Sequence, residues 1–313
     1  MGWWVDLGMV KRITLILLSF FCIINAQIAL PTFQGVHKPH SSTSSGTVTF
    51  TNCSATENNG PTQSQVNSTY TSGNSLYGAV TINTQGIQEW TVPATATYTI
   101  EAWGAEGGGT TGGKGARIKG DFNLSTGDVL KIVIGQMGTA ETYSNTLGNA
   151  GGGGGGSYVI KSPYNTTGSI LVIAGGGGGS GSKYVGYGGI TSETDSNTGS
   201  AGNGGTPGSN GNSGAGFSGN GALGGHNGET IAYSFVNDAV GGVGHSGGGQ
   251  GYGGFGGGAG DAYADGGGGG GYSGGNSAGN HYGGYGAGSY NAGSNQDNTA
   301  DTRESHGQVI IIW

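Results

Sequence analysis

The sequence predicts an all-β protein, a β-sandwich into which glycine-rich segments are inserted. Short runs of alternating apolar and polar residues recur along the chain, which is the pattern of half-buried strands. Glycine accounts for 77 of the 313 residues, whereas its ordinary share is about 7%. No window of about eleven residues carries a convincing helical period, so no substantial α-helix is expected in the mature chain.

The strand pattern can be followed from one end of the chain to the other. In the clearest strand Tyr98, Ile100 and Ala102 share one face. Short strands divided by turn residues favour two packed sheets. The expected strands are residues 47–51, 79–83, 88–92, 97–103, 116–122, 129–134, 157–161, 170–174 and 308–313, with a further alternation at Ile231, Tyr233 and Phe235.

Glycine-dense segments interrupt this series of strands. The chain has no strict G-X-Y period and only 6 prolines, which excludes a collagen triple helix. Ordering one backbone unit costs about 1–2 kcal/mol, whereas a net hydrogen bond returns about 0.5–1.5 kcal/mol. A bundle of polyglycine-II helices can satisfy its N–H and C=O groups between neighbours, while disorder of residues 175–300 is the alternative. The insertions are expected mainly at 105–115, 148–156, 175–225 and 240–295.

A helix with three residues per turn predicts where side chains gather. Residues at i and i+3 then lie on the same edge. The aromatic pairs with this spacing are Tyr184/Tyr187, Tyr252/Phe255 and Tyr282/Tyr285. Tyrosine supplies amphipathic contact area and is enriched at interfaces. We therefore predict partner binding at Tyr252, Phe255, Tyr282 and Tyr285; the alternative is that these rings cover the flank of the glycine bundle against the sandwich.

The first residues have the pattern of a secretory signal peptide. Lys11 and Arg12 precede an apolar run over residues 13–24, and Ala26 supplies a small residue for cleavage. The run is shorter than the roughly 20 residues that span a bilayer, although an uncleaved anchor is the alternative. We expect a signal peptide at 1–26, a flexible Ser/Thr/Pro-rich lead-in at 27–45 and a glycine-rich domain at 46–313. The mature protein is expected to be secreted, with no membrane span.

After cleavage of the signal peptide a single cysteine remains, which is unusual for a secreted protein. Cys22 leaves with the signal peptide, so Cys53 is unpaired. An odd cysteine in an oxidising compartment indicates intermolecular pairing or a free thiol, and the alternative is a buried, inert side chain. Asn-x-Ser/Thr sequons predict surface positions open to N-glycosylation in a eukaryotic secretory route, at Asn52, Asn67, Asn123 and Asn165.

No motif indicates catalysis, a cofactor or a metal site. The G-x-G-x-x-G matches do not open a helix after a strand, and no phosphate-binding P-loop is present. Asp261 and Asp265 could share a cation, but solvated side chains are the favoured interpretation. His226, His245 and His281 lie in glycine-rich segments and are expected at the surface. The net charge is −7 with no basic stripe, which argues against nucleic acid or an anionic membrane surface as partner.

Several motifs together resemble a known family. Gly60–Gln65 has the sequence GPTQSQ, residues 86–93 have GIQEWTVP, and residues 98–105 have YTIEAWGA. Further matches follow in the same order at residues 127–128, 135–138, 151–159, 171–179, 266–275 and 306–309. Over roughly residues 47–313 the chain resembles the extracellular glycine-rich domain of the anaplastic lymphoma kinase and leukocyte tyrosine kinase receptors. The resemblance implies a tumour-necrosis-factor-like β-sandwich that carries packed polyglycine helices.

The chain also departs from that family. The family has a cysteine partner for Cys53 where Val66 stands here, which puts the disulfide in doubt. No kinase activity is expected of this chain. We expect a secreted recognition module that binds an extracellular protein or glycan without catalysis. The alternatives are a structural or adhesive matrix or fibre component, for which homo-oligomers are expected, and a soluble ectodomain relative of a receptor tyrosine kinase that lacks the kinase.

Overall fold

The computed structural model describes residues 45–140, 149–225, 228–245 and 251–313. The expected signal peptide, the lead-in up to residue 44 and His226 lie outside the described residues. Residues 45–313 form one compact unit. Within the part that is described, no helix has the length and apolar character needed to cross a membrane.

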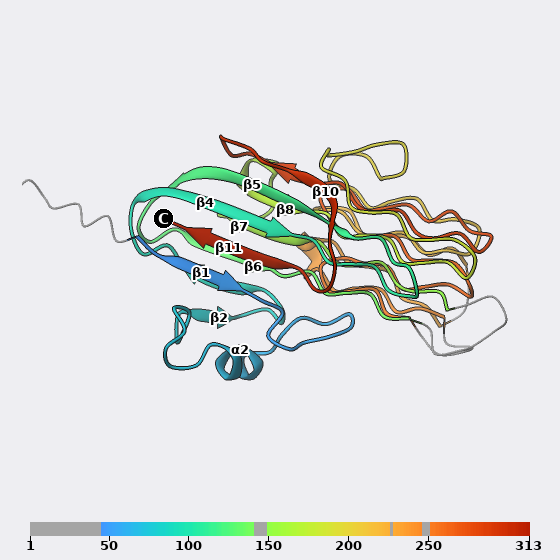
Figure 1. Cartoon of the computed structure of the whole chain (residues 1–313), viewed down its shortest axis with the longest axis horizontal. Coiled ribbons are helices and arrows are strands. Elements are labelled where there is room, and N and C mark those ends of the chain that lie inside the picture. The colour runs from blue at the N-terminus through green and yellow to red at the C-terminus, as the bar shows by residue number, and fades with distance from the viewer. Residues whose placement is uncertain (1–44, 141–148, 226–227, 246–250) are drawn as a thin grey trace, which may run out of the picture. The chain divides into compact units, whose positions relative to one another are not determined.

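Two antiparallel sheets form a β-sandwich, which confirms the all-β prediction (Figure 1). The first sheet has the order β1 (Thr47–Phe50), β11 (Gln308–Ile312), β4 (Ala96–Trp103), β5 (Gly115–Leu124) and β10 (Thr299–Arg303). The second has the order β2 (Val80–Ile82), β3 (Gln88–Thr91), β6 (Val129–Val133), β7 (Ser157–Lys161), β8 (Ile170–Ala174) and β9 (Tyr290–Asn291). The tumour-necrosis-factor-like topology stays a prediction.

In the part of the chain that the structure describes, three short helices accompany the strands, and two of the strands were not expected. α2 (Gln63–Thr69) begins at Thr62, whose side chain forms a capping box with Gln65. The other helices are the 3-10 turns η1 (Thr167–Ser169) and η2 (Phe235–Asn237). η2 corrects the strand expected around residue 233, where only an isolated bridge joins Thr230 to Val243. β9 and β10 lack an apolar alternation and are held by pairing with β8 and β5.

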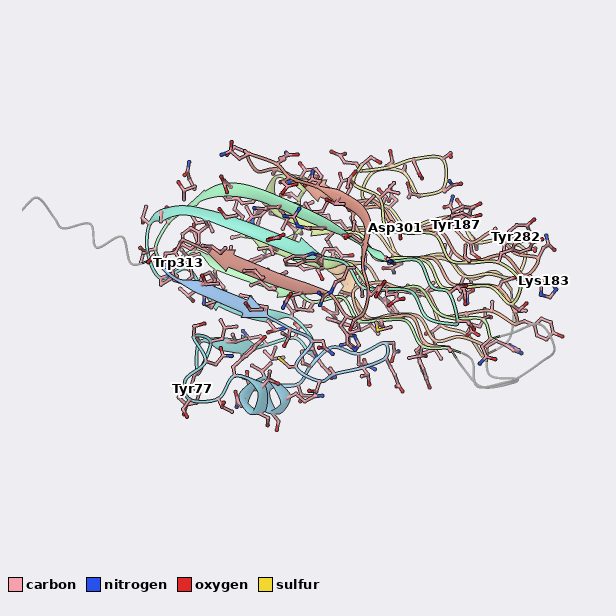
Figure 2. The ribbon with its side chains drawn as sticks, in the orientation of Figure 1. Tyr77, Lys183, Tyr187, Tyr282, Asp301 and Trp313 are labelled. Atoms are coloured by element: carbon pink, nitrogen blue, oxygen red, sulfur yellow. The ribbon has the colours of Figure 1, made fainter. Side chains whose placement is uncertain are left out.

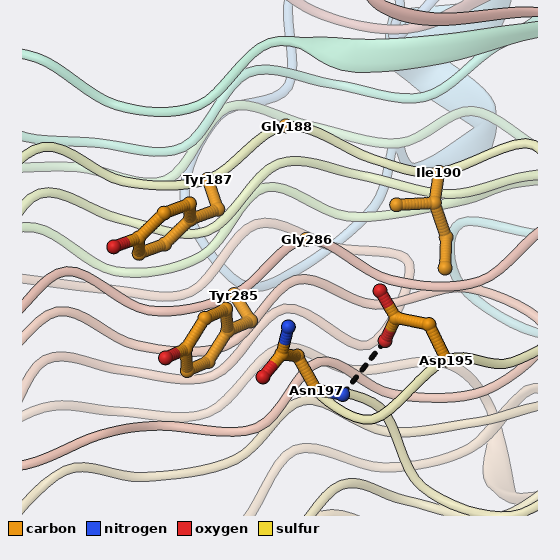
Figure 3. Close-up of a pocket in the computed structure, with 7 residues that line it drawn as sticks. All are labelled: Tyr187, Gly188, Ile190, Asp195, Asn197, Tyr285 and Gly286. Atoms are coloured by element: carbon orange, nitrogen blue, oxygen red, sulfur yellow. Dashed lines mark hydrogen bonds between the residues drawn. The ribbon is translucent and has the colours of Figure 1, made fainter.

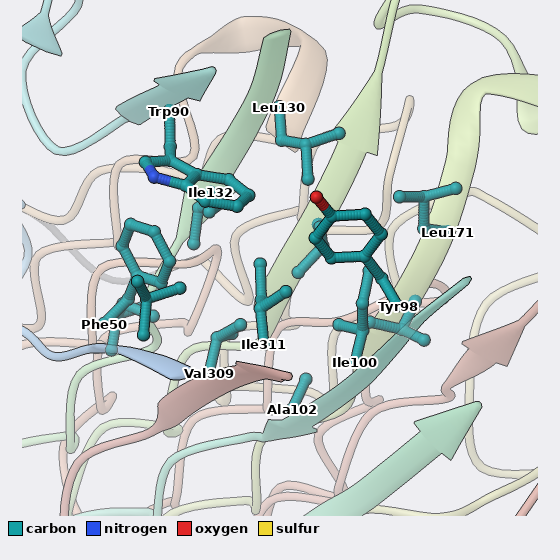
Figure 4. Packing of buried hydrophobic residues seen from close by; sticks show 14 of the residues in the cluster. Phe50, Trp90, Tyr98, Ile100, Ala102, Leu130, Ile132, Leu171, Val309 and Ile311 are labelled. Carbon is teal, nitrogen blue, oxygen red and sulfur yellow. The ribbon is translucent and has the colours of Figure 1, made fainter. Parts of the chain in front are cut away.

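The sandwich core consists of inward-facing residues from both sheets (Figure 4). Ile100, Ile132 and Ile311 are fully buried there. Tyr98 is also buried, and its hydroxyl donates to the Ala94 carbonyl oxygen at 2.7 Å. The Trp313 ring stacks on Tyr98 with 5.5 Å between centroids, so the last residue of the sequence closes this core.

A second hydrophobic cluster covers the other face of the second sheet. Tyr158 and Ile173 project from β7 and β8 toward Phe217, Phe235 and Phe255 of the glycine-rich insertions. Burial on both faces explains why β7 and β8 are almost continuously apolar. The insertions therefore supply part of the core as well as the glycine segments.

The strands lead into the glycine segments at one end of the sandwich (Figure 1). Antiparallel pairing sets the last residues of β4 beside the first of β5, as the pair Trp103 and Arg117 shows. In the same way Val133 pairs with Tyr158, and Ser157 pairs with Ala174. The C-terminal ends of β4, β6 and β8 and the N-terminal ends of β5, β7 and β9 therefore lie at the same end of the sandwich. The glycine segments that connect these strands start there as neighbours.

Hydrogen bonds between these segments repeat with a period of three residues. In residues 176–181 successive N–H groups donate to three different neighbouring segments, and then to the first again. This period is what packed polyglycine-II helices require, and the assignment of that conformation stays a prediction. The donations run from Gly176 and Gly179 to Gly270 and Gly267, from Gly177 and Ser180 to Ala105 and Gly108, and from Gly178 and Gly181 to Tyr187 and Tyr184.

Glycine is required at the interior positions because the backbones touch. A Cβ added at Gly268 would overlap the carbonyl oxygen of Gly275, and one added at Gly153 would overlap that of Gly268. Neither oxygen can move aside by a change of rotamer, since both are backbone atoms. Gly211 is also packed, against the side chain of Ser277; the Asn/Ser-rich stretch around it is therefore not loose, although a side chain can yield.

We expect Gly268→Ala to lower the free energy of unfolding by about 3 kcal/mol, the upper end of the usual cost of overpacking, because the new methyl group must displace backbone. Gly168→Ala is the matched control. Gly168 is exposed and a Cβ there meets nothing within 4 Å, so its effect should stay within about 0.5 kcal/mol. Denaturant unfolding of both variants measures the difference. Equal tolerance at the two sites would show that the segments are not packed as described.

Candidate functional site

Four tyrosines form an exposed ladder on the glycine segments, which we call the tyrosine edge: Tyr184, Tyr187, Tyr282 and Tyr285. The rings of Tyr184 and Tyr282 are stacked, with centroids 4.1 Å apart and planes inclined by 10°. Tyr187 and Tyr285 repeat this contact at 4.7 Å and 17°. Figure 2 shows Tyr187 and Tyr282 beyond the strand ends, whereas Tyr77 lies beside α2.

Two parallel segments position these rings. The Tyr187 N–H donates to the Gly284 carbonyl oxygen at 3.0 Å, and three residues later Ile190 donates to Ala287 at 3.0 Å. Both segments carry tyrosines three residues apart, so one alignment stacks both pairs. Glycine makes the close approach possible, because a Cβ at Gly283 would overlap the carbonyl oxygen of Val185.

The tyrosine edge faces solvent. Tyr184 is 46% exposed, Tyr187 43% and Tyr282 39%, while Tyr285 is half-buried. The rings contact each other and not the rings of the sandwich core. The pKa of Tyr282 is raised above its ordinary value, mainly by the side chain of the stacked Tyr184.

A surface pocket of about 180 Å³ adjoins the pair Tyr187 and Tyr285 (Figure 3). Tyr187, Tyr285 and Ile190 give it apolar walls, and Asp195 and Asn197 give it polar groups. The Asp195 carboxylate is fixed because it accepts a hydrogen bond from the Asn197 backbone N–H at 2.7 Å. The pocket can therefore hold a ring or side chain against tyrosine and offer it acceptors and an amide. Sequence reasoning did not find Ile190, Asp195 or Asn197, which carry no motif.

The sequence-predicted aromatic residues do not all lie on this edge. Tyr282 and Tyr285 do, together with Tyr184 and Tyr187, which the spacing also indicated. Phe255 is fully buried, and its ring fills the space that side chains at Gly60 and Gly86 would occupy. The prediction of Phe255 as a surface contact is thus corrected. Tyr252 is half-buried on another segment, where its N–H donates to the Thr139 hydroxyl at 2.7 Å.

Asp261 and Asp265 are buried, which corrects the expectation that they are solvated. Both residues are almost inaccessible to solvent. A carboxylate oxygen of Asp261 accepts from the Gly251 N–H at 2.9 Å, and Asp265 accepts from the His281 N–H. Among the described residues, no group of three or more His, Cys, Asp or Glu side chains could hold a metal ion. The expectation of no metal, cofactor or catalytic group stays a prediction.

Cys53 is a free thiol in the described structure. It is buried, and it belongs to the same core cluster as Val66 and Tyr70. Its sulfur donates to the Thr51 carbonyl oxygen at 3.6 Å. Burial is the main cause that raises the pKa of Tyr70, and the neighbouring Cys53 adds to it. The burial supports the interpretation of an inert thiol over intermolecular pairing.

Three of the four sequons present an exposed asparagine. Asn67, Asn123 and Asn165 are exposed. Asn52 is half-buried, and its side-chain nitrogen donates to the Ala55 carbonyl oxygen at 2.6 Å. Glycosylation itself stays a prediction at all four positions.

Comparison with known proteins gives a local similarity to a receptor. No family model matches the chain. Over 103 residues it is 36% identical to the leukocyte tyrosine kinase receptor of Mus musculus; the match covers 28% of this chain and 11% of the receptor. The chain is therefore similar to a small part of that receptor, which supports the resemblance that the motifs indicate.

We expect Cys53 to react with a thiol reagent only after denaturation, because the folded core excludes the reagent. Cys53→Ser should change the free energy of unfolding by less than about 1.5 kcal/mol, since no disulfide is lost. Cys53→Val is the contrasting variant: the backbone φ is 48° here, a region that β-branched residues avoid, so it should unfold much more easily. Disulfide-linked dimers in the native protein would contradict the prediction.

Proposed function

We propose that this chain is an extracellular recognition module that acts without catalysis and binds its partner through the tyrosine edge. The observation that carries the proposal is the pair of exposed tyrosine stacks beside a pocket with a fixed carboxylate. The local similarity to a receptor supports a place outside the cell, as does the exposure of three sequon asparagines.

Tyrosine is suited to this role. Its ring contributes apolar contact area and its hydroxyl both donates and accepts hydrogen bonds, which is why it is enriched at interfaces. Binding normally costs free energy for ordering side chains and loops. On the tyrosine edge that cost is small, because stacking already holds the rings and hydrogen bonds hold both backbones.

The pocket adds selectivity to the contact. Ile190 and the tyrosine rings offer an apolar surface, and Asp195 and Asn197 offer directional hydrogen bonds. An extracellular protein or glycan can present both kinds of group, a side chain or sugar ring for the walls and hydroxyl or amide donors for the carboxylate.

We expect Tyr282→Ser/Tyr285→Ser to weaken partner binding by more than tenfold, since interface tyrosines often contribute about 2 kcal/mol. The wild-type chain, immobilised, first captures its partner from the extracellular fluid of the source organism, and titration then gives the affinity of each variant. The melting temperature should stay close to that of the wild type.

Tyr77→Ser is the control for this experiment. Tyr77 is 63% exposed but lies beside α2 and away from the tyrosine edge (Figure 2), so its loss should leave binding intact. Unchanged binding by the double variant would refute the site. A large drop in its melting temperature would instead assign the rings to packing, and filaments that form with rising concentration would favour the structural alternative.

A further inference from the structure

The tyrosine edge brings two pairs of oxidisable phenols into ring contact. Tyr184 and Tyr282 are nearly a hundred residues apart in the chain, yet their rings are almost parallel at 4.1 Å. This near-parallel stacking sets the two phenol rings face to face, within reach of each other. The ortho carbons, which are the coupling positions of a tyrosyl radical, are the immediate ring neighbours of the hydroxyl-bearing carbons.

We propose that the tyrosine edge is an oxidative cross-linking site, at which a haem peroxidase with hydrogen peroxide joins Tyr184 to Tyr282, and Tyr187 to Tyr285, as dityrosine. The cross-link would be a covalent modification of the chain itself and is independent of partner binding.

The chemistry balances with one peroxide for each cross-link. Each phenol loses one electron and its hydroxyl proton to become a tyrosyl radical, and the peroxide is reduced to two molecules of water. The two radicals form one bond between an ortho carbon of each ring. Each ortho carbon then gives up its hydrogen, which returns to the phenol oxygen. Two ring C–H bonds are thus replaced by one C–C bond, and both hydroxyls are restored.

The geometry favours coupling within one chain. The second ring is already in contact when the first is oxidised, so the effective concentration of the partner is far above that of another molecule. Exposure matters as well, because the oxidant must reach the rings and the rings must rotate from stacking into the bonded arrangement. Tyr184 and Tyr282 are 46% and 39% exposed, so the oxidant can reach both rings, and a radical pair has solvent on one side into which the rings can turn.

The chain contains its own matched control. Tyr272 and Tyr290 are also in ring contact, with centroids at 4.8 Å and planes inclined by 42°. Tyr272, however, is only 4% exposed and packs in the second hydrophobic cluster. If ring distance alone determined the reaction, this pair would be cross-linked too. Because the oxidant must reach the rings and the rings must rotate, we expect no cross-link between Tyr272 and Tyr290.

The test treats dilute purified protein with a haem peroxidase and hydrogen peroxide and isolates the monomer. We expect dityrosine fluorescence and the loss of two hydrogen atoms in mass for each cross-link formed. The protein is then denatured and cleaved at acidic residues. This places the two tyrosine segments on different peptides, because Glu193, Glu229 and Asp238 lie between the segments in the sequence. Mass spectrometry should find a peptide that contains Tyr184 or Tyr187 joined to one that contains Tyr282 or Tyr285.

Tyr184→Phe/Tyr187→Phe keeps the stacked rings but removes two phenols, so the monomer should lose the cross-link while its untreated melting temperature stays unchanged. Tyr272→Phe should cross-link as the wild type does. The proposal is overturned if dityrosine appears only in dimers, if it joins Tyr272 to Tyr290, or if it persists in the Tyr184→Phe/Tyr187→Phe variant. A treated monomer without any dityrosine overturns it as well.

Discussion

Direct contact between glycine backbones is the constraint on which the rest of the structure depends. Many interior N–H groups of the segments donate to a neighbouring carbonyl, and in residues 176–181 the neighbours change with a period of three residues. A Cβ at such a position would occupy the place of a carbonyl oxygen. The high glycine content thus follows from packing. A chain rich in glycine has a large entropy to lose on folding, and hydrogen bonds on every side of each segment offset that loss.

The β-sandwich determines where the glycine segments begin. Antiparallel pairing in both sheets brings the ends of six strands to one place, so the segments that continue from them are neighbours before any glycine contact forms. The insertions in turn cover the outer face of the second sheet with Phe217, Phe235 and Phe255. The two parts therefore stabilise each other through backbone hydrogen bonds and through a shared apolar cluster.

A rigid bundle of this kind presents side chains only at its edges. The tyrosine edge arises because two parallel segments carry tyrosine with the same three-residue spacing. Stacked phenols are both a contact surface and a pair of redox-sensitive groups, so one arrangement supports the proposed recognition role and the proposed cross-link.

The sequence by itself determined the class of fold, most of the strands, the packing role of glycine and the unpaired state of Cys53, because alternation, composition and residue counts are local properties. The i, i+3 spacing also identified Tyr184, Tyr187, Tyr282 and Tyr285 as occupants of an edge. Only the tertiary structure decided which segments lie together, since a glycine backbone that donates to a different neighbour at each of three successive residues, as in residues 176–181, carries no local signal for which neighbours these are. For that reason Phe255 and the two aspartates are buried although their spacing or polarity suggested the surface, and Tyr184 stacks on Tyr282 although nothing local links them.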